Sequence, residues 1–201
     1  MALASKLFRN NKELHQYNTL SNNGNEVTFC TIGDGSTSEG IFLEAINAMG
    51  VLQVPVVLSV WDDGHAISVP VSLQTTKASI SKALAGFQRD TENNGWEIMT
   101  VNGWDYPALC LTYKKATELA REKHVPVLVH VLELTQPQGH STSGSHERYK
   151  SEERLAWEKE YDCNKQFKEW IIKQAFASEE ELKAIEDQAL ITVKEGKDAA
   201  W

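Results

Sequence analysis

Apolar and polar residues alternate along the chain in short blocks. Four apolar runs, at 27–32, 54–60, 96–101 and 126–134, have the length and β-branched content of buried strands. Between them, apolar residues recur at helical spacing over 38–49, 80–88 and 106–122. Strands that alternate with helices predict a parallel β-sheet with helices on both faces, so the expected fold class is α/β.

The two ends of the chain differ from this central part. Residues 1–11 predict a helix, and the Asn- and Gly-rich stretch 15–26 predicts a loop. Residues 151–199 are rich in charge and predict two solvated helices, with a capping box formed by Ser178 and Glu181. These helices are expected to pack through Leu155, Trp157, Phe167, Trp170, Ile171, Leu182 and Ile185. We therefore divide the chain into an α/β domain, 1–150, and a C-terminal helical segment, 151–201.

Composition narrows the class of protein. The chain has 201 residues, of which 41% are hydrophobic, enough for a packed core. Its net charge of −8 argues against a nucleic-acid surface. Apolar runs of membrane-spanning length and a signal peptide are both missing from the sequence. Cys30, Cys110 and Cys163 lack metal-like spacing, and Cys30 and Cys110 lie in apolar runs and are expected to be reduced core residues. We therefore expect a cytoplasmic protein that binds neither nucleic acid nor membrane.

Acidic, glycine-containing turns follow the first two predicted strands. The first is Gly33-Asp34-Gly35, and the second is the run 61–65, WDDGH. Neighbouring parallel strands bring such turns to one edge of the sheet, where open α/β sheets place their ligands. Mg²⁺ prefers oxygen ligands and usually takes one or two protein carboxylates, and glycine lets the backbone approach a ligand closely. The spacing alone leaves two readings open, a metal site or ordinary turns that cap strands.

The stretch GDGSTSEG, together with the acidic cluster near Asp63, resembles the thiamine diphosphate motif. The resemblance is to the alpha subunit, or alpha half, of the decarboxylating component of 2-oxoacid dehydrogenase complexes. It implies the thiamine diphosphate-binding fold, with thiamine diphosphate and Mg²⁺ as cofactors. The metal ligands that it implies are Asp34, Asp63 and the backbone carbonyl of His65. The cofactor-binding residues that it implies are Gly33, Asp34, Gly35, Ser36, Asp63, His65, Ile67 and His140.

A second region, 136–150, reads QPQGHSTSGSHERYK and has no periodicity, so it predicts a loop. By itself it is typical of either a mobile connector or a functional loop. The letters GHS, followed by a tyrosine and a basic residue, resemble the active-site loop of the same family. The resemblance implies that His140 approaches cofactor and substrate, with Ser141 beside it as a second catalytic residue. Arg148 and Tyr149 would brace the loop.

The sequence departs from the family pattern at two places. Asp62-Asp63 stands where the family has two asparagines, which adds negative charge that favours Mg²⁺ and opposes the diphosphate. Which of the two aspartates faces the metal stays open at this point. Gln136 and Gln138 stand near the position where relatives usually carry an arginine before the GHS.

Three polar residues in the predicted elements receive no chemical role. Glu44 is interpreted as a polar residue of a mostly buried helix. His124 and His130 flank the last predicted strand, where a lone histidine usually serves packing or lies at the surface.

The function that the resemblance implies is oxidative decarboxylation of a 2-oxo acid, with acyl transfer to a lipoyl group. It implies three partners: a beta-type half, either separate or fused downstream, a lipoyl-bearing acyltransferase component, and further subunits of a homo- or hetero-oligomer. Related subunits carry a long segment before this point, so the fold is expected to be incomplete at the N-terminus. The glutamate that activates the cofactor lies in the beta half of such enzymes, so this chain alone is expected to show no turnover.

Two alternatives stay open at the level of sequence. One is another thiamine diphosphate enzyme, transketolase-like or acetoin dehydrogenase. The other is a non-catalytic assembly module of the same fold.

Overall fold

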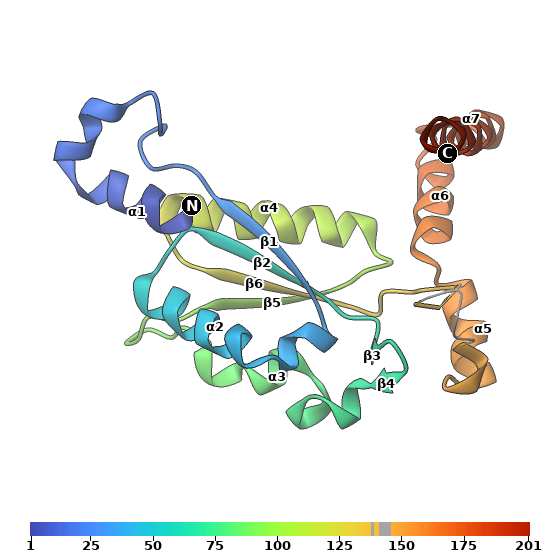
Figure 1. The fold of residues 1–201 in the computed structure, drawn as a ribbon, viewed down its shortest axis with the longest axis horizontal. Helices are drawn as coiled ribbons and strands as arrows, with labels where there is room; N and C mark the ends of the chain where they lie inside the picture. The colour runs from blue at the N-terminus through green and yellow to red at the C-terminus, as the bar shows by residue number, and fades with distance from the viewer. Residues whose placement is uncertain (138, 141–145) are drawn as a thin grey trace.

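The computed structural model describes residues 1–137, 139–140 and 146–201. Its centre is a four-stranded sheet with the order β1-β2-β6-β5 (Figure 1). The strands are β1 (Thr28–Gly33), β2 (Val56–Trp61), β5 (Glu97–Asn102) and β6 (Val127–Leu132). All three neighbouring pairs are parallel. The predicted parallel sheet is therefore confirmed. A separate two-stranded antiparallel sheet pairs β3 (His65–Ala66) with β4 (Val69–Pro70).

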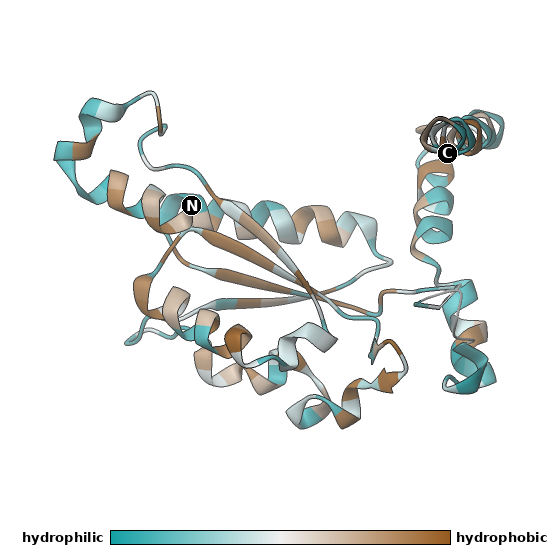
Figure 2. Ribbon diagram, in the orientation of Figure 1, coloured by the Kyte–Doolittle hydropathy of each residue, from teal (hydrophilic) through white to brown (hydrophobic). Residues whose placement is uncertain are grey.

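Helices cover both faces of the sheet, as predicted. On one face α2 (Gly40–Leu52) and α3 (Ile80–Ala83) bury a core whose members are Phe42, Ile46, Ile80, Leu84, Trp96, Val54, Val56, Leu58, Val60 and Leu128. On the other face, α4 (Tyr106–Lys123) packs Ala116 and Ala120 against Val57, Val127, Val129 and Val131. Because β2 and β6 are buried on both faces, their sequences read as continuous apolar runs, which Figure 2 shows as brown central strands.

Local boundaries differ from the predictions where short 3₁₀ turns replace loops or helical turns. α1 (Ala2–Asn10) forms as predicted, but Lys12–Tyr17 is a 3₁₀ helix that extends into the start of the predicted loop, 15–26. α2 begins at Gly40, two residues late, because Gly35–Ser38 is a 3₁₀ turn and Glu39 becomes the N-cap. α3 is short because Ala85–Phe87 also turns as a 3₁₀ helix. The other 3₁₀ turns are Val71–Leu73, Thr76–Ala78 and His146–Arg148.

The C-terminal segment contains three helices where two were predicted. They are α5 (Glu152–Glu160), α6 (Cys163–Lys173) and α7 (Glu179–Ala200). α5 and α6 separate because Asp162 caps α6 by accepting a hydrogen bond from the amide of Lys165 at 2.9 Å. The predicted Ser178–Glu181 capping box is confirmed at the start of α7.

These three helices lie at the opposite end of the molecule from α1 (Figure 1). Aromatic contacts join them to the start of α4: Tyr106 lies 4.3 Å from Phe167 and 5.2 Å from Trp170 between ring centroids. The predicted packing role of these two aromatic residues is confirmed. That of Ile185 is wrong, since its side chain is 64% exposed on α7. The expected core position of Cys110 is also wrong, because this residue of α4 is exposed.

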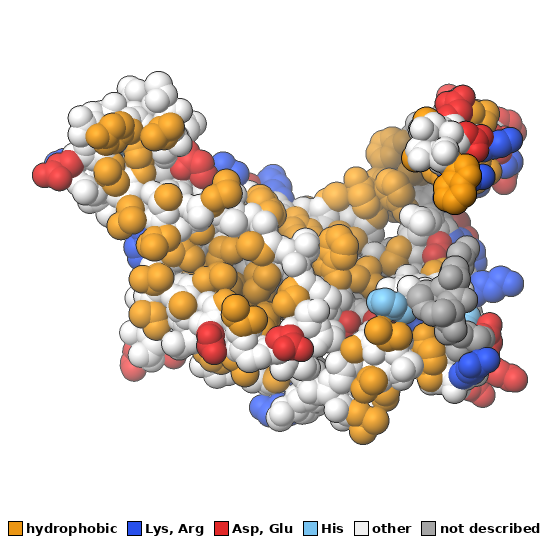
Figure 3. Space-filling model, viewed as in Figure 1, with side chains coloured by type: hydrophobic (Ala, Val, Ile, Leu, Met, Phe, Trp, Pro, Cys, Tyr) orange, Lys and Arg blue, Asp and Glu red, His pale blue; other side chains and the backbone are white. Residues whose placement is uncertain are grey.

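Apolar side chains also lie exposed on the face that Figure 3 shows, over α1, β1 and α2. The most exposed of them on the last two elements are Ile41, Val51, Phe29 and Leu43. β1 is an edge strand, which pairs with β2 alone among the described strands. Within the described residues, every helix is too short or too polar to cross a membrane.

The order of the strands creates a crevice at one edge of the sheet. The chain passes from β1 through α2 to β2 on one face, and from β5 through α4 to β6 on the other. These crossovers run inward from opposite edges, so the direction of winding reverses between β2 and β6. Ligand sites of doubly wound sheets lie at such a reversal, beyond the carboxyl ends of the strands.

Candidate functional site

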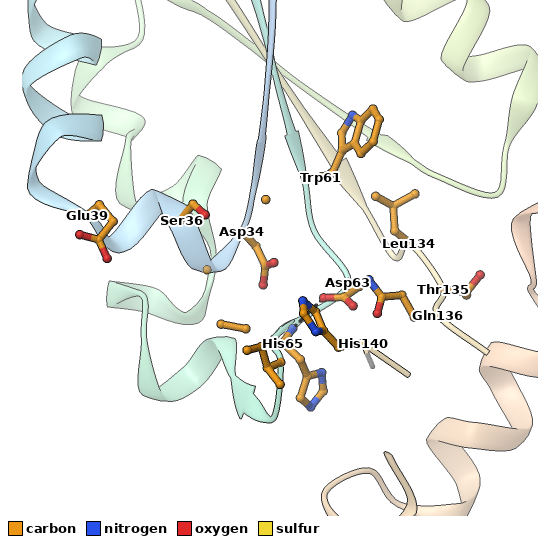
Figure 4. Close-up of a pocket in the computed structure, with 14 residues that line it drawn as sticks. Asp34, Ser36, Glu39, Trp61, Asp63, His65, Leu134, Thr135, Gln136 and His140 are labelled. Atoms are coloured by element: carbon orange, nitrogen blue, oxygen red, sulfur yellow. Dashed lines mark hydrogen bonds between the residues drawn. The ribbon is translucent and has the colours of Figure 1, made fainter. Parts of the chain in front are cut away.

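A cavity of about 670 Å³ lies beyond the carboxyl ends of β1, β2 and β6, at this reversal. The predicted cofactor-binding residues all line it: Gly33, Asp34, Gly35, Ser36, Asp63, His65, Ile67 and His140. Figure 4 shows Asp34 and Asp63 coming from the ends of neighbouring strands, with His65 and His140 along the same cavity. The structure thus brings together residues more than a hundred positions apart in sequence. Ser141 lies outside the described residues.

Asp34 is the most unusual carboxyl group of the cavity. It is only 6% exposed, and its Oδ2 atom is buried without a hydrogen-bond partner among the described residues. Its backbone is fixed, because its amide donates to the carbonyl of Trp61 at 3.0 Å and its carbonyl accepts from the Thr37 hydroxyl at 2.6 Å. Burial, and then the negative charges of Asp62 and Asp63, raise the pKa of Asp34 to about 7. A cation bound beside Asp34 would favour its ionised form and so offset the effects of burial and of the neighbouring negative charges.

Gly35 explains why the first turn contains glycine. A Cβ atom built on Gly35 would overlap the Cβ of Ala66 in β3. The two turns that follow β1 and β2 therefore touch at this glycine, and no larger residue fits without moving one of them. A Cβ atom on Gly33, by contrast, meets nothing within 4 Å.

The two adjacent aspartates point to different places. Asp62 is buried, and its Oδ2 lies 2.7 Å from Nε2 of His130, while its Oδ1 accepts a hydrogen bond from the amide of Gly64 at 2.8 Å. Asp63 lines the cavity, and its Oδ1 accepts from the amide of His65 at 3.1 Å. Of the two alternatives left open by the sequence, this geometry favours Asp63 as the residue that faces a metal.

His130 is the residue of this site that sequence reasoning missed. It lies in the middle of β6 with 0% exposure, not at the flank of the strand. Its partners, Asp62 and Ser81, lie 68 and 49 positions away in the sequence. The only signal in the sequence was a lone histidine in an apolar strand together with an aspartate where the family motif has asparagine.

The loop that carries His140 reaches the cavity from the side of β6. His140 is exposed at the cavity, and Gln136, which stands near the family's arginine position, lines it as well. At the far end of the loop, the Tyr149 ring lies 5.6 Å from the His65 ring between centroids. Tyr149 thus contacts the second turn of the site through its ring, whereas Arg148 is exposed.

Four charged residues hold both ends of this loop on α5. Arg154 of α5 lies 2.7 Å from Glu133, which precedes the loop, and 2.8 Å from Glu158. Glu158 in turn lies 2.8 Å from Lys150, the last residue of the loop, and both partners are almost completely buried. Buried charges are tolerated when they are paired and hydrogen-bonded in this way. These ion pairs therefore hold the two ends of the loop against α5, beside the cavity.

The donor set of the cavity suits a hard cation that is shared with a phosphate. Asp34 offers a buried oxygen that has no partner in residues 1–137, 139–140 and 146–201, and Asp63 offers a second carboxylate. Within the described part of the chain, His, Cys, Asp and Glu side chains do not form any group of three that could hold a metal ion unaided. Mg²⁺ commonly takes one or two carboxylates and completes its coordination with carbonyl oxygen, phosphate and water, so the residues present fit this ion.

Comparison with known proteins agrees with this geometry. The dehydrogenase E1 component family matches residues 1–200. The chain is 36% identical over 175 residues to the pyruvate dehydrogenase E1 component subunit alpha of Acholeplasma laidlawii, covering 85% of this chain and 48% of the relative. It is 28% identical over 174 residues to the subunit of the same name from Rickettsia bellii, covering 87% of this chain and 51% of the relative.

A third relative carries a different name. The 2-oxoisovalerate dehydrogenase subunit alpha of Bacillus subtilis is 27% identical over 174 residues, covering 87% of this chain and 50% of the relative. The chain spans about half the length of the curated relatives it matches. The match over nearly every residue, together with the fold, shows that the chain belongs to the dehydrogenase E1 component family.

Proposed function

We propose that this chain forms the cofactor-holding alpha part of a thiamine diphosphate-dependent 2-oxoacid dehydrogenase, which decarboxylates a 2-oxo acid oxidatively and passes the acyl group to a lipoyl group. The observation that carries the proposal is the buried Oδ2 of Asp34, which lies beside Asp63 in a cavity at the reversal point of the sheet and has no partner among the residues that the structure describes. The named relatives are alpha subunits of pyruvate and 2-oxoisovalerate dehydrogenases, which supports a 2-oxo acid as the substrate class.

Mg²⁺ would be held by Asp34, Asp63 and the backbone carbonyl of His65, with the cofactor's diphosphate beside it. Gly33, Gly35 and Ser36 line the same wall of the cavity, and the open space beside Gly33 leaves room for the diphosphate. When bound, thiamine diphosphate supplies the carbanion chemistry of decarboxylation. The chain's own contribution is to hold and orient that group, and to balance the charge of three clustered carboxylates with a cation.

His140 is proposed to act at the substrate side of the cavity, with Ser141 beside it. A histidine there can donate or accept a proton near neutral pH. Ile67, which also lines the cavity, has a backbone φ of +58° and presents an exposed apolar side chain toward bound cofactor. Gln136 offers the substrate an uncharged hydrogen-bonding group, where relatives usually carry an arginine nearby.

The proposal includes partners and an organisation of the chain. Residues 1–150 would form the α/β cofactor domain, and 151–201 a helical segment that braces the loop through Arg154 and Glu158. A beta-type half, separate or fused, would complete the active site, and a lipoyl-bearing acyltransferase component would accept the acyl group. A reducing compartment such as the cytoplasm suits the three cysteines, which are all free.

The proposal is tested by titrating thiamine diphosphate into the complete gene product by calorimetry, with Mg²⁺ and with EDTA. Trp61 lies at the cavity and is 53% exposed, so its fluorescence gives a second readout. We expect binding only when Mg²⁺ is present, and its loss in Asp34→Asn. Turnover is then measured with an artificial electron acceptor on short and branched 2-oxo acids, acetoin and sugar phosphates.

Asp105→Asn provides the matched control. Asp105 also follows a strand of the sheet, but it caps α4 by accepting from the amide of Ala108 at 3.0 Å and does not line the cavity. Asparagine caps helices as well as aspartate does, so this variant should bind like the parent protein. Mg²⁺-independent binding, or equal loss in both variants, would reject Asp34 as a metal ligand. Turnover of acetoin or sugar phosphates alone would reject the 2-oxo acid.

A further inference from the structure

A chain of hydrogen bonds runs beneath the cavity from α3 to the second turn. The amide and hydroxyl of Ser81 lie 3.3 Å and 3.0 Å from Nδ1 of His130. Nε2 of the same ring lies 2.7 Å from Oδ2 of Asp62. Oδ1 of Asp62 accepts from the amide of Gly64 at 2.8 Å. These bonds connect three elements that are far apart in sequence: α3, β6 and the turn after β2.

The bond from Ser81 assigns the tautomer of His130. Because the Ser81 amide can only donate, Nδ1 must be the accepting nitrogen, and the ring proton is carried by Nε2. His130 therefore donates to the Asp62 carboxylate, a charge-assisted hydrogen bond that compensates the burial of this charge. With both oxygens engaged, the Asp62 side chain is directed away from the cavity, and the neighbouring Asp63 is left to line it.

We propose that His130 is a positioning residue for the metal site. It holds Asp62 inside the sheet edge and so fixes the turn that presents Asp63 and the carbonyl of His65. This inference rests on the proposed function only for the identity of the ion; the positioning itself is a property of the metal-free protein. Without the Nε2 donor, Asp62 would be a buried charge with no cationic or donor side chain, and it would turn toward water in the cavity.

The chain of bonds also accounts for the aspartate at position 62. An asparagine could not accept on both side-chain atoms, since its amide nitrogen only donates. Asp62, in contrast, accepts from His130 with one oxygen and from Gly64 with the other. The aspartate is thus matched to a histidine donor beneath it, and it need not contact the metal to be required.

The first test measures hydrogen–deuterium exchange of the metal-free complete gene product, in the peptide that contains Gly64 and His65. Both amides donate to the side chains of Asp62 and Asp63, so their exchange reports on the turn directly. His130→Leu and His130→Asn remove a donor that reaches Asp62, whereas His130→Gln keeps one at the place of Nε2. We expect exchange to accelerate about tenfold in the Leu and Asn variants and to stay near the parent value in Gln.

The second test measures the Mg²⁺-dependent binding of thiamine diphosphate by the same variants. Loss of a group that orients a metal ligand typically weakens metal affinity about ten- to a hundredfold, and we expect this loss in Leu and Asn but not in Gln. His124→Gln is the matched control, because His124 is also buried but bonds the carbonyl of Gly24 at 2.9 Å near the opposite end of the sheet. It should lower the melting temperature without changing exchange in the turn or cofactor affinity.

The outcomes separate the two proposals. If the parent protein does not bind thiamine diphosphate, the proposed function fails, and the exchange experiment still decides the role of His130. If Asn and Gln at position 130 behave alike in both tests, the inference is overturned while the proposed function stands. Equal effects of His124→Gln and His130→Asn on the turn would also overturn it, because they would indicate general loss of stability.

Discussion

At the amino end of the sheet Glu26 lies among hydrogen-bond donors, whereas at the carboxyl end a buried oxygen of Asp34 meets no donor in the part of the chain that the structure describes. Burial opposes ionisation of Glu26, but hydrogen bonds from the Asn22 amide and the Ser21 and Ser5 hydroxyls lower its pKa to about 2. Burial and neighbouring carboxylates raise the pKa of Asp34 to about 7. The carboxylate at one end of the sheet is therefore satisfied by hydrogen bonds, whereas the one at the other end lies where we propose that a cation binds.

The hydrogen-bond partners of Arg9, His124 and His130 also differ between the two ends of the sheet. At the amino end, Arg9 donates to the carbonyls of Gly24 and Arg121 at 2.9 Å and 2.7 Å, and His124 bonds the carbonyl of Gly24. These contacts join α1, the loop and α4 through neutral backbone groups. At the carboxyl end, His130 bonds a carboxylate instead. The difference indicates that polar contacts at the amino end join neighbouring elements, whereas those at the carboxyl end shape the proposed binding site.

The largest expected effect comes from placing a methyl group at the glycine of each end. Gly24→Ala must adopt a φ of +69° and bring Cβ to 2.6 Å from the Ser5 carbonyl, and Gly35→Ala would overlap Ala66. Each should lower the free energy of unfolding by about 3 kcal/mol, through strain and overpacking. Denaturant titration measures this loss, and Gly33→Ala, which has free space, is the control. Of the two destabilised variants, only Gly35→Ala should also weaken Mg²⁺-dependent cofactor binding, and equal binding by Gly24→Ala and Gly35→Ala would contradict the division. Gly33→Ala serves as a control for stability alone, because Gly33 lines the cavity.

The second expected effect concerns the amino end alone. Arg9→Ala removes hydrogen bonds to three backbone carbonyls, those of Gly24, Arg121 and Glu122, and one to the Asn25 side chain at 2.9 Å. We expect a loss of about 2 kcal/mol in stability, since hydrogen bonds to charged groups are individually worth more than neutral ones. Cofactor affinity of the folded protein should not change. Arg9→Lys separates charge from geometry, because lysine keeps the charge but cannot serve several carbonyls at once.

A third effect has the opposite sign. Asp34→Asn removes one of three clustered negative charges from a buried position. The metal-free protein should therefore gain about 1 kcal/mol at pH 8, or about 3 °C in melting temperature, while it loses Mg²⁺-dependent binding. Thermal unfolding in EDTA measures the gain. An unchanged or lower melting temperature would show that the site is not electrostatically strained without its cation.

The smallest effect is the pH dependence of stability in EDTA. The folded pKa of Asp34, about 7, lies above its ordinary value of 3.8, so its contribution is greatest below pH 4 and is lost as pH rises through 7. The folded pKa of Glu26, about 2, lies below its ordinary value of 4.5, so its contribution is present above pH 4.5 and is lost as pH falls through 2. Asp34→Asn should remove only the change in stability near neutral pH, and Glu26→Gln only the change at acid pH. Because Glu26 is exposed, its contribution to the change in stability at acid pH should be about 0.5 kcal/mol.

The sequence predicted the sheet well because its signal is local. β2 and β6 are buried on both faces, so their apolar runs were unambiguous, and the helices between them showed clear spacing. Helix ends were predicted less well, since the 3₁₀ turn at Gly35–Ser38 delays α2 and Asp162 divides the tail into an extra helix. Such boundaries depend on a few backbone hydrogen bonds that periodicity does not report.

In the candidate site, too, the features with a local sequence signal were predicted and those that depend on long-range contacts were not. The GDG turn and the Asp63 turn were found because each follows a strand, and the geometry of adjacent parallel strands brings them together. The division of roles between Asp62 and Asp63 was not predictable, because it depends on His130, a contact across 68 positions. The connection from Glu133 to Lys150 through α5 was missed for the same reason, since surface-like charges in a helical tail gave no sign of burial.

The bond between Asp62 and His130 has a consequence for how this protein and its relatives diverge. A buried carboxylate without its donor and a buried histidine without its acceptor are each unfavourable, so neither residue can change freely while the other stays. Family members with an acid at the first position of this pair should therefore carry histidine, or another donor of similar reach, at the strand position below. Members with asparagine there should have an apolar or differently bonded residue instead. If positions 62 and 130 change together among relatives, the departure from the family motif is a coordinated replacement of two residues and does not indicate loss of a metal site.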